Sequence, residues 1–335
     1  MRIAAIVISL AASLIPCSAA AAGTVAATPP MGWNSWDCYG TTVTEAQVKA
    51  NARYMAKYLK QHGWQYIVVD IQWSEPNPKA HGYRPNADLS MDVYGRLIPA
   101  VNRFPSSANG RGFGPLAAYV HGLGLRFGIH IMRGIPRRAV DANLPVFGSR
   151  AHAGEIADRA SVCPWNTDMY GVDMRRPGAQ DYYDSILKLY AGWGVDFIKA
   201  DDMARPAHRA EIAALHQAIV KIGRPMVLSL SPGPAMVKDA AFFQQNANMW
   251  RVSDDFWERL AAAATEFHPD VHLERHGTPR RMAGCGHASA GPAGDPRRAR
   301  RRPHDPLHPR RAAHRDEPLV DRAIAADVRR RPAEQ

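Results

Sequence analysis

Two short segments of this chain place a cation and a carboxylate at a spacing suited to acid–base chemistry. In the segment FIKADD, Lys199 precedes Asp201 by two residues, and in the segment WRVSDD, Arg251 precedes Asp255 by four. Side chains two or four residues apart in a strand lie on the same side, so these cations can hold some of the carboxyl groups ionised. A third segment, VDIQW from Val69, supplies another carboxylate, Asp70, beside an aromatic residue. Each residue alone fits a strand-end ion pair or a cap, but together they predict a functional site.

Paired carboxyl groups in a cleft with aromatic walls can cleave a glycosidic bond. One carboxylate attacks or stabilises the sugar cation, and the other group delivers a proton to the leaving oxygen. A tryptophan ring covers the apolar face of a pyranose. The tryptophans at or beside the ends of predicted strands are Trp33, Trp36, Trp73, Trp250 and Trp257. We expect at least Trp33 and Trp250 to pack in the core instead.

The chain from residue 31 to about residue 260 predicts the elements that position these side chains. Short β-branched and aromatic runs alternate there with amphipathic stretches, as in β/α units around a parallel sheet. The predicted strands are 32–36, 65–70, 126–131, 196–201, 225–230 and 248–253. The predicted helices include 44–61, 179–193 and 206–222. The spacing between strands suits an α/β fold of the TIM (β/α)8-barrel type with insertions. Six strands are predicted where a closed barrel of this type has eight, so the predicted barrel is incomplete.

The composition sets the broad class of protein. With 335 residues and 46% hydrophobic content, the chain can bury a sizeable core, which excludes a wholly disordered protein. A mean hydropathy of −0.32 excludes a multi-span membrane protein. Four cysteines are too few for a disulfide scaffold. Because no His or Cys spacing fits a metal site and no glycine loop fits a phosphate, we predict no metal and no cofactor.

The N-terminus predicts export. Arg2 precedes a long apolar run and then a stretch of small residues, which is the pattern of a signal peptide. We therefore predict a signal peptide over residues 1–22 and a secreted or periplasmic protein without stable membrane association, with a lipid anchor at Cys17 as a minor alternative. Export permits a disulfide between Cys38 and Cys163.

The last 75 residues, 261–335, differ from the rest of the chain. They hold 15 Arg, no Lys and 10 acidic residues, and therefore +5 of the total charge of +11. This segment also has too few apolar residues to offset the conformational entropy that ordering would cost, and we predict a disordered basic tail. A basic arm that binds nucleic acid or another polyanion is the competing interpretation. Because the tail has a single aromatic residue, Phe267, to stack on bases, we predict no nucleic-acid partner.

Five motifs in the chain resemble those of glycoside hydrolase family 27, the α-galactosidase family. They are MGWNSW from Met31, GWQYIVVD from Gly63, FGIH from Phe127, KAD from Lys199 and WRVSDD from Trp250. The resemblance spans 29–260. It implies a barrel enzyme that hydrolyses terminal α-linked galactose by a double displacement with retention of configuration.

The resemblance also implies roles for single residues. Asp201 would be the nucleophile and Asp255 the general acid/base, with carboxyl groups about 5 Å apart as in retaining glycosidases. The residues predicted to bind the substrate are Trp36, Asp70, Trp73, His130, Lys199 and Arg251. Lys199 favours the ionised form of Asp201. We expect repulsion from Asp254 and partial burial beside Trp257 to keep the proton on Asp255.

Departures from the family's pattern leave the sugar open. Asp70 is followed by Ile71 and Gln72 where the family often has paired aspartates, near the 4- and 6-hydroxyl region of the sugar. The segment LSLSPG from Leu228 replaces a Cys-Glu-Trp loop near the 2-position, and Met203 replaces a cysteine. Galactose is the default sugar, and N-acetylgalactosamine and β-L-arabinopyranose are alternatives. A non-catalytic carbohydrate-binding remnant is a further alternative.

The tail has a second interpretation as an out-of-frame translation. Shifted by one base, codons 282–291 can encode WPDADMLPLG, and codons 308–331 can encode TPDEQRTVMSLWSIARSPLMFGGD. Both strings resemble the family's seventh- and eighth-strand regions. We infer that the frame slips between about residues 260 and 282, and we expect a truncated chain with weak or no activity. Wobble bases incompatible with these strings would contradict the inference.

Overall fold

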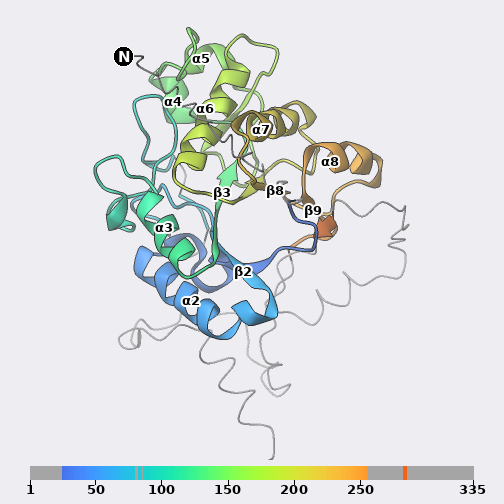
Figure 1. Ribbon diagram of the computed structural model, residues 1–335. Coiled ribbons are helices and arrows are strands. Elements are labelled where there is room, and N and C mark those ends of the chain that lie inside the picture. The colour runs from blue at the N-terminus through green and yellow to red at the C-terminus, as the bar shows by residue number, and fades with distance from the viewer. Residues whose placement is uncertain (1–24, 80–81, 85, 256–281, 285–335) are drawn as a thin grey trace, which may run out of the picture.

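The computed structural model describes residues 25–79, 82–84, 86–255 and 282–284. A parallel sheet curls into an open half-barrel at its centre, with helices on the outer side (Figure 1). In spatial order its strands are β1 (Met31–Asn34), β2 (Trp64–Val69), β3 (Arg126–Met132), β7 (Phe197–Asp201), β8 (Val227–Leu230), β9 (Met249–Arg251) and β10 (Met282–Gly284). Spatial order follows chain order, as in a (β/α) barrel. The predicted fold class, an incomplete TIM (β/α)8-type barrel, is confirmed.

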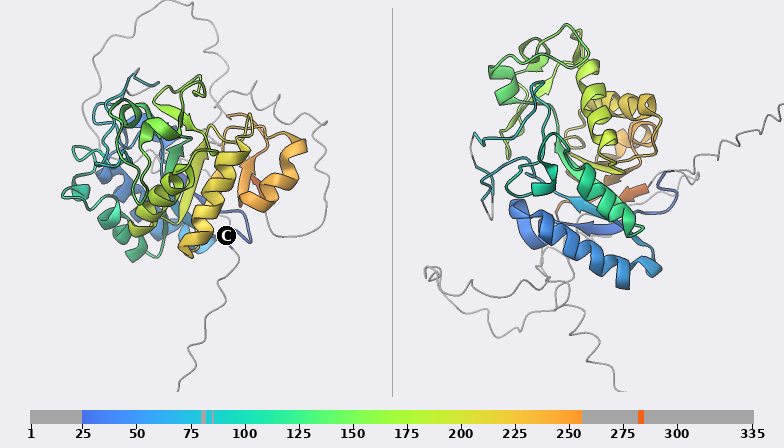
Figure 2. Two further views of the ribbon diagram at one scale, coloured as in Figure 1. Left: turned by 90° about the horizontal axis from the view of Figure 1, so that it is seen from above. Right: turned by 60° about the vertical axis from the view of Figure 1, so that its left-hand side comes forward.

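Helices connect successive strands of this sheet and cover its outer side, as the two views in Figure 2 show. The longer ones are α2 (Glu45–Tyr58), α3 (Gly114–Gly122), α6 (Ala179–Gly192), α7 (Arg209–Ile222) and α8 (Ala240–Asn246). The shorter ones are α1 (Trp36–Tyr39), α4 (Arg137–Asp141), α5 (Ala153–Ile156), η1 (Gly40–Thr42), η2 (Lys60–His62), η3 (Pro105–Ser107) and η4 (Val237–Asp239). Helix α6 packs against α7, and α2 packs against β2.

Between β3 and β7 the chain forms a second, antiparallel sheet. Its spatial order is β4 (Ile135–Pro136), β6 (Met169–Val172) and β5 (Ala157–Asp158). The excursion follows the C-terminal end of β3, the end of the barrel on which such folds build their sites. It therefore places two functional loops, one after β3 and one before β6, next to the strand ends.

Side chains on the barrel strands alternate between two cores. On β2, Ile67 and Val69 are fully buried in the main core, which includes residues of α2, α3 and α6. Tyr66 and Val68 belong instead to a smaller cluster with Phe197, whose ring centroid lies 5.5 Å from that of Tyr66. Burial on both faces explains why β2 is almost continuously apolar in sequence.

Local signals set the ends of the helices. The side-chain oxygen of Gln47 accepts the backbone N–H of Thr44 at 2.9 Å, which satisfies a free donor where α2 begins. Gly223 ends α7 with a φ of 69°, a left-handed conformation that glycine adopts without strain. Helix α7 was predicted from Pro206 but begins at Arg209, because Ala204 and Ala207 form an antiparallel bridge first.

The six predicted strands correspond to β1, β2, β3, β7, β8 and β9. A seventh strand, β10, lies within the segment predicted as a disordered tail, and it pairs in parallel with β9. The rest of that segment and the predicted signal peptide lie outside the described residues. No helix in the described part is both long and apolar enough to cross a membrane.

Candidate active site

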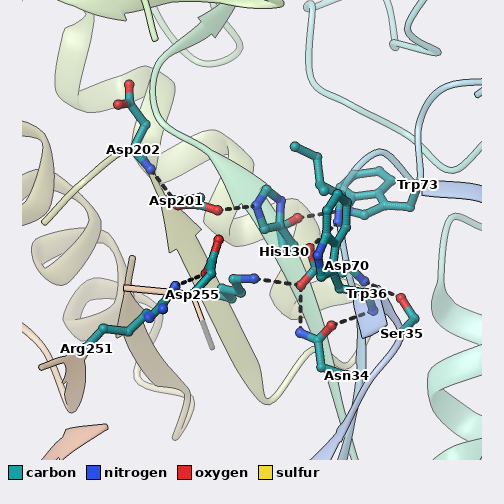
Figure 3. Close-up of polar contacts among 12 residues, drawn as sticks. Asn34, Ser35, Trp36, Asp70, Trp73, His130, Asp201, Asp202, Arg251 and Asp255 are labelled. Carbon is teal, nitrogen blue, oxygen red and sulfur yellow. Dashed lines mark hydrogen bonds and ion pairs between the residues drawn. The ribbon is translucent and has the colours of Figure 1, made fainter. Parts of the chain in front are cut away.

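A pocket of about 270 Å³ opens at the C-terminal ends of the barrel strands. Its lining residues are Trp36, Asp70, Ile71, Tyr83, Trp165, Lys199, Asp201, Arg205, Ser231, Pro232, Arg251, Asp254 and Asp255. The structure thus brings together six of the eight residues predicted for the site. Figure 3 shows five of them, which come from the start of α1, the residue after β2, the ends of β7 and β9, and the segment after β9: Trp36, Asp70, Asp201, Arg251 and Asp255.

Asp201 ends β7 and is almost fully buried. Its Oδ2 lies 3.1 Å from Nε2 of His130 on β3, and its Oδ1 accepts the backbone N–H of Asp202 at 3.0 Å. Burial by itself raises the pKa of Asp201, but hydrogen bonds from His130 and Ser231 and the charge of Lys199 outweigh it, and the pKa lies at about 2. Asp201 is therefore an anion at neutral pH, as a nucleophile must be.

Lys199 and Asp70 form a buried ion pair beside Asp201. The Nζ of Lys199 lies 2.9 Å from Oδ2 of Asp70, and Nδ2 of Asn34 donates to the same oxygen at 2.6 Å. Burial lowers the pKa of Lys199, but the charges of Asp70 and Asp201 outweigh it and raise the pKa above its ordinary value. Lys199 was predicted to bind the sugar and to favour the ionised form of Asp201. The structure gives it a direct contact with Asp70 and an electrostatic effect on Asp201.

Asp255 contacts Arg251 at the open side of the pocket, through an ion pair between Oδ1 and Nη1. Its side chain is 49% exposed, and Asp254 turns away to pair with Arg205 at 2.6 Å. Each of the two carboxylates thus contacts its own arginine, and the repulsion between Asp254 and Asp255 stays a prediction. Trp257, the other predicted neighbour, lies outside the described residues. Within the described part, Nε and Nη2 of buried Arg251 meet no hydrogen-bond partner.

An aromatic wall runs along one side of the pocket. The ring of Trp36 stacks on that of Tyr83 with centroids 6.1 Å apart, and Tyr83 contacts Trp165 at 5.6 Å. Trp165 is 38% exposed. Burial, and then the charges of Asp70 and Asp201, raise the pKa of Tyr83, so its hydroxyl stays protonated.

Sequence reasoning missed Tyr83, Trp165, Arg205 and Ser231. The first three lie in loops without periodicity, so only their residue types could have marked them. Ser231 directly follows β8, and its place at a strand end was a signal that could have found it.

Two predicted substrate contacts do not line the pocket. Trp73 is 2% exposed, and its Nε1 donates to the carbonyl oxygen of His130 at 2.7 Å. Its ring packs edge-on against Phe113 and Trp193 in the main core, so it cannot cover a sugar. His130 is also 2% exposed and lies behind Asp201. Both predictions are corrected: Trp73 is a core residue, and His130 holds the carboxylate rather than the sugar.

The remaining sequence expectations near the site have mixed outcomes. Trp250 packs in the main core, as expected, with its ring 5.9 Å from that of Phe243. Trp33 packs only partly against that core. Among the described residues, Cys38 and Cys163 are thiols rather than halves of a disulfide. No cluster of three His, Cys, Asp or Glu side chains in this part of the chain could hold a metal ion.

Four aspartates, three cationic side chains and an aromatic wall meet at the strand ends of a curled parallel sheet. This combination is typical of glycoside hydrolases built on a (β/α) barrel. No profile of a known protein family matches the chain.

Individual relatives do match. The chain is 29% identical over 272 residues to α-galactosidase A of Cellvibrio japonicus, covering 78% of this chain and 54% of that protein. It is 27% identical to the α-galactosidase of Coffea arabica, covering 71% of this chain and 50% of that protein. The chain thus spans about half the length of the curated relatives it matches.

Solved structures also match. A family 27 β-L-arabinopyranosidase from Geobacillus stearothermophilus is 62% identical with a TM-score of 0.69, over 70% of this chain and 55% of that one. A proposed α-N-acetylgalactosaminidase from Bacillus halodurans is 57% identical with a TM-score of 0.61, over 69% and 53%. In sequence and in fold, the chain is similar to family 27 glycoside hydrolases, as its motifs predict.

Proposed function

We propose that this chain carries the catalytic site of a retaining glycoside hydrolase for terminal sugars of the galacto configuration. The observation that carries the proposal is that Asp201, held ionised, and Asp255 line one pocket. The sequence similarity to α-galactosidases and to a family 27 β-L-arabinopyranosidase supports the same class of substrate. The two sugars share their ring stereochemistry, and the pentose lacks the hydroxymethyl group.

In this mechanism, Asp201 attacks the anomeric carbon while Asp255 gives a proton to the leaving oxygen. The glycosidic C–O bond breaks as the ester bond to Asp201 forms. Asp255 then takes a proton from water, which attacks the same carbon and releases the sugar with its original configuration. The contact of Arg251 with Asp255 sets the position of the acid.

Ile71 favours the pentose as the second candidate substrate. It lines the pocket directly after Asp70, in the region where the family resemblance places contacts to the 4- and 6-hydroxyls. An isoleucine side chain offers no hydrogen bond to a 6-hydroxyl, and a buried hydroxyl without a partner is disfavoured. A sugar without the hydroxymethyl group avoids this cost.

The test compares 4-nitrophenyl α-D-galactopyranoside with 4-nitrophenyl β-L-arabinopyranoside on the full chain. We expect release of nitrophenol, with the first sugar anomer seen by NMR retaining its configuration. Asp201→Asn should abolish turnover. An inverted product would refute the mechanism. A folded chain that binds galactose or arabinose without hydrolysing either glycoside would instead support the non-catalytic remnant.

Variants at Ile71 separate the two sugars. Ile71→Asn adds hydrogen-bonding groups and should raise kcat/KM for the galactoside relative to the arabinopyranoside by about tenfold. Ile71→Val keeps the side chain apolar and is the matched control, with an unchanged ratio. An unchanged ratio in Ile71→Asn would contradict the role given to this side chain.

We also propose that the protein is secreted or periplasmic, from the signal-peptide pattern in its first 22 residues. N-terminal sequencing of protein recovered from the producing cell tests it. A mature chain that begins near Ala22 to Thr24 is the expected result, and an intact N-terminus inside the cell would contradict it.

A further inference from the structure

A buried cluster of charges lies behind the pocket, outside the residues that line it. Its centre is Arg133, which follows β3 and is 3% exposed. Asp202, which follows β7, and Glu211, on α7, are each 5% exposed. Removing three charges from water is costly, and apolar residues of similar size often fill such sites at no loss of stability. The cluster therefore invites a functional explanation.

Arg133 holds Asp202 through both its backbone and its side chain. Nε donates to the carbonyl oxygen of Asp202 at 3.1 Å and to its Oδ2 at 2.8 Å, and Nη2 lies 2.8 Å from the same Oδ2. Burial lowers the pKa of Arg133, but the charges of Glu211 and Asp202 outweigh it and raise the pKa, so the guanidinium stays charged. The planar fork fits this geometry in a way that an ammonium group does not.

Glu211 fixes the other side of the guanidinium. Its Oε2 accepts from Nη1 of Arg133 at 3.0 Å. Its Oε1 accepts the backbone N–H of Val172 at 3.0 Å and the hydroxyl of Tyr183 at 2.8 Å. Burial raises the pKa of Tyr183 well above its ordinary value, so the hydroxyl remains a donor. Strand β6 and helices α6 and α7 thus all anchor the guanidinium.

Neighbouring residues also restrict the space around the guanidinium of Arg133. A Cβ atom at Gly171 would lie 2.6 Å from Nη1 of Arg133 and 2.8 Å from Oγ of Ser161, which itself accepts from Nη1 at 3.0 Å. Only a glycine at this position leaves room for the side chain in its observed place.

The cluster connects directly to the predicted nucleophile. Asp202 has a φ of +58°, a left-handed conformation that is unfavourable for a residue with a side chain. In this conformation its backbone N–H donates to Oδ1 of Asp201 at 3.0 Å, while its own carboxylate points away from Asp201 (Figure 3). The backbone N–H of Arg133 also donates to the carbonyl oxygen of Asp201 at 3.0 Å.

We propose that Arg133 is a positioning residue: it clamps Asp202 in the left-handed conformation and so fixes the carboxylate of Asp201 for attack on the sugar. The proposal rests on the proposed function for the attack itself. The hold on Asp202 is a property of the folded chain and does not need turnover. Glu211 keeps the guanidinium in the orientation that makes the clamp, so it supports the nucleophile from a helix.

The first readout is independent of activity. Amide hydrogen exchange of Asp202, followed by NMR, is compared in the wild-type chain and in Arg133→Lys. Losing the clamp should speed this exchange about tenfold, the effect of weakening one hydrogen bond. The amide of Ser231, which donates to the carbonyl oxygen of Ala200 at 3.0 Å, is the internal control and should not change.

The second readout is the attack itself. A 5-fluoro glycosyl fluoride of the better sugar forms an ester with Asp201 and releases fluoride, and intact-protein mass spectrometry gives the rate. Arg133→Lys should slow this step about 100-fold, as expected for a misplaced nucleophile, while the dissociation constant of the free sugar changes less than threefold. Gly171→Ala displaces the guanidinium without removing its charge and should also slow ester formation. It replaces Arg133→Lys as the test if that variant does not fold.

Arg103→Lys is the matched control. Arg103 is also a buried arginine, but its hydrogen bonds go to backbone carbonyls in the loops after β1 and β2. Its variant should lower the unfolding temperature yet leave the rate of ester formation unchanged. Equal losses of ester formation in both arginine variants would overturn the proposal, as would unchanged exchange of the Asp202 amide. No labelling of the wild-type chain would refute the proposed function, while amide exchange still decides whether Arg133 holds Asp202.

Discussion

The charge of Asp201 should be visible in how stability depends on pH. Its pKa is 3.8 in an ordinary setting and about 2 in the folded chain. One pKa unit corresponds to about 1.4 kcal/mol, so the ionised carboxylate contributes about 2 kcal/mol to the free energy of unfolding. Because the folded pKa is the lower one, this contribution is present above about pH 4 and is lost as the pH falls through 2. About half of it should be gone by pH 3.

Asp201→Asn removes this titration and keeps nearly the same side-chain shape. We expect the free energy of unfolding of the variant, from urea denaturation between pH 6 and pH 3, to fall by about 1 kcal/mol less than that of the wild type. Asp141→Asn is the control, since that carboxylate is 64% exposed and its pairing with Arg159 should contribute little. Parallel curves for wild type and Asp201→Asn would refute the account of how His130 and Lys199 hold the carboxylate ionised.

Three further perturbations test other parts of the structure. Lys199→Met leaves the buried carboxylate of Asp70 without its cation and should cost about 3–5 kcal/mol in urea denaturation, whereas Lys199→Met combined with Asp70→Asn should cost less than the single change. Additive costs would contradict a coupled pair. Trp165→Ala should lower kcat/KM for a disaccharide about tenfold but leave a glycosyl fluoride unaffected, because fluoride cannot reach the exposed ring. Phe147→Ala, at a ring of similar exposure elsewhere, should change neither. Gly32→Ala places a methyl group against the backbone of β2 and should destabilise the sheet by about 2 kcal/mol, seen as a lower Tm.

The strands could be predicted from the sequence because their signal is local. Between its polar ends the run 65–70 is apolar, the run 196–201 is apolar apart from its ends and Lys199, and each run ends in an aspartate. The same local alternation placed Lys199 and Asp201 on one side, and both line the pocket. The resemblance to a family then added roles that spacing alone does not give.

The errors arose where the position of a side chain depends on partners distant in sequence. Trp73 lies three residues after Asp70, yet the rings that enclose it come from the residue before α3, from α6 and from the residue after α6. Asp254 and Asp255 are neighbours in the chain, but Arg205 draws one carboxylate away. Trp165 reaches the pocket from the excursion between β3 and β7. None of these contacts leaves a periodic trace in the sequence.

The clamp on the nucleophile could not be predicted for a related reason. Arg133 lies in a loop directly after β3, and Glu211 lies on α7, 78 residues further along the chain. Their meeting point depends on the order of β3 and β7 in the sheet. The left-handed conformation of Asp202 has no sequence signal either, because glycine would be the expected residue there.

Among the described residues, the polar partners of Asp201 come from three adjacent strands, β3, β7 and β8, and the turns that follow them, whereas Asp255 pairs with Arg251 at the open side. A mutation can therefore displace the acid, Asp255, without displacing the nucleophile, Asp201, or the reverse. A chain with its acid displaced would still accept glycosides whose aglycones depart without protonation, such as nitrophenolates, and would discriminate sharply against alkyl glycosides. The steepness of a Brønsted plot against aglycone acidity would then measure how well Asp255 is placed.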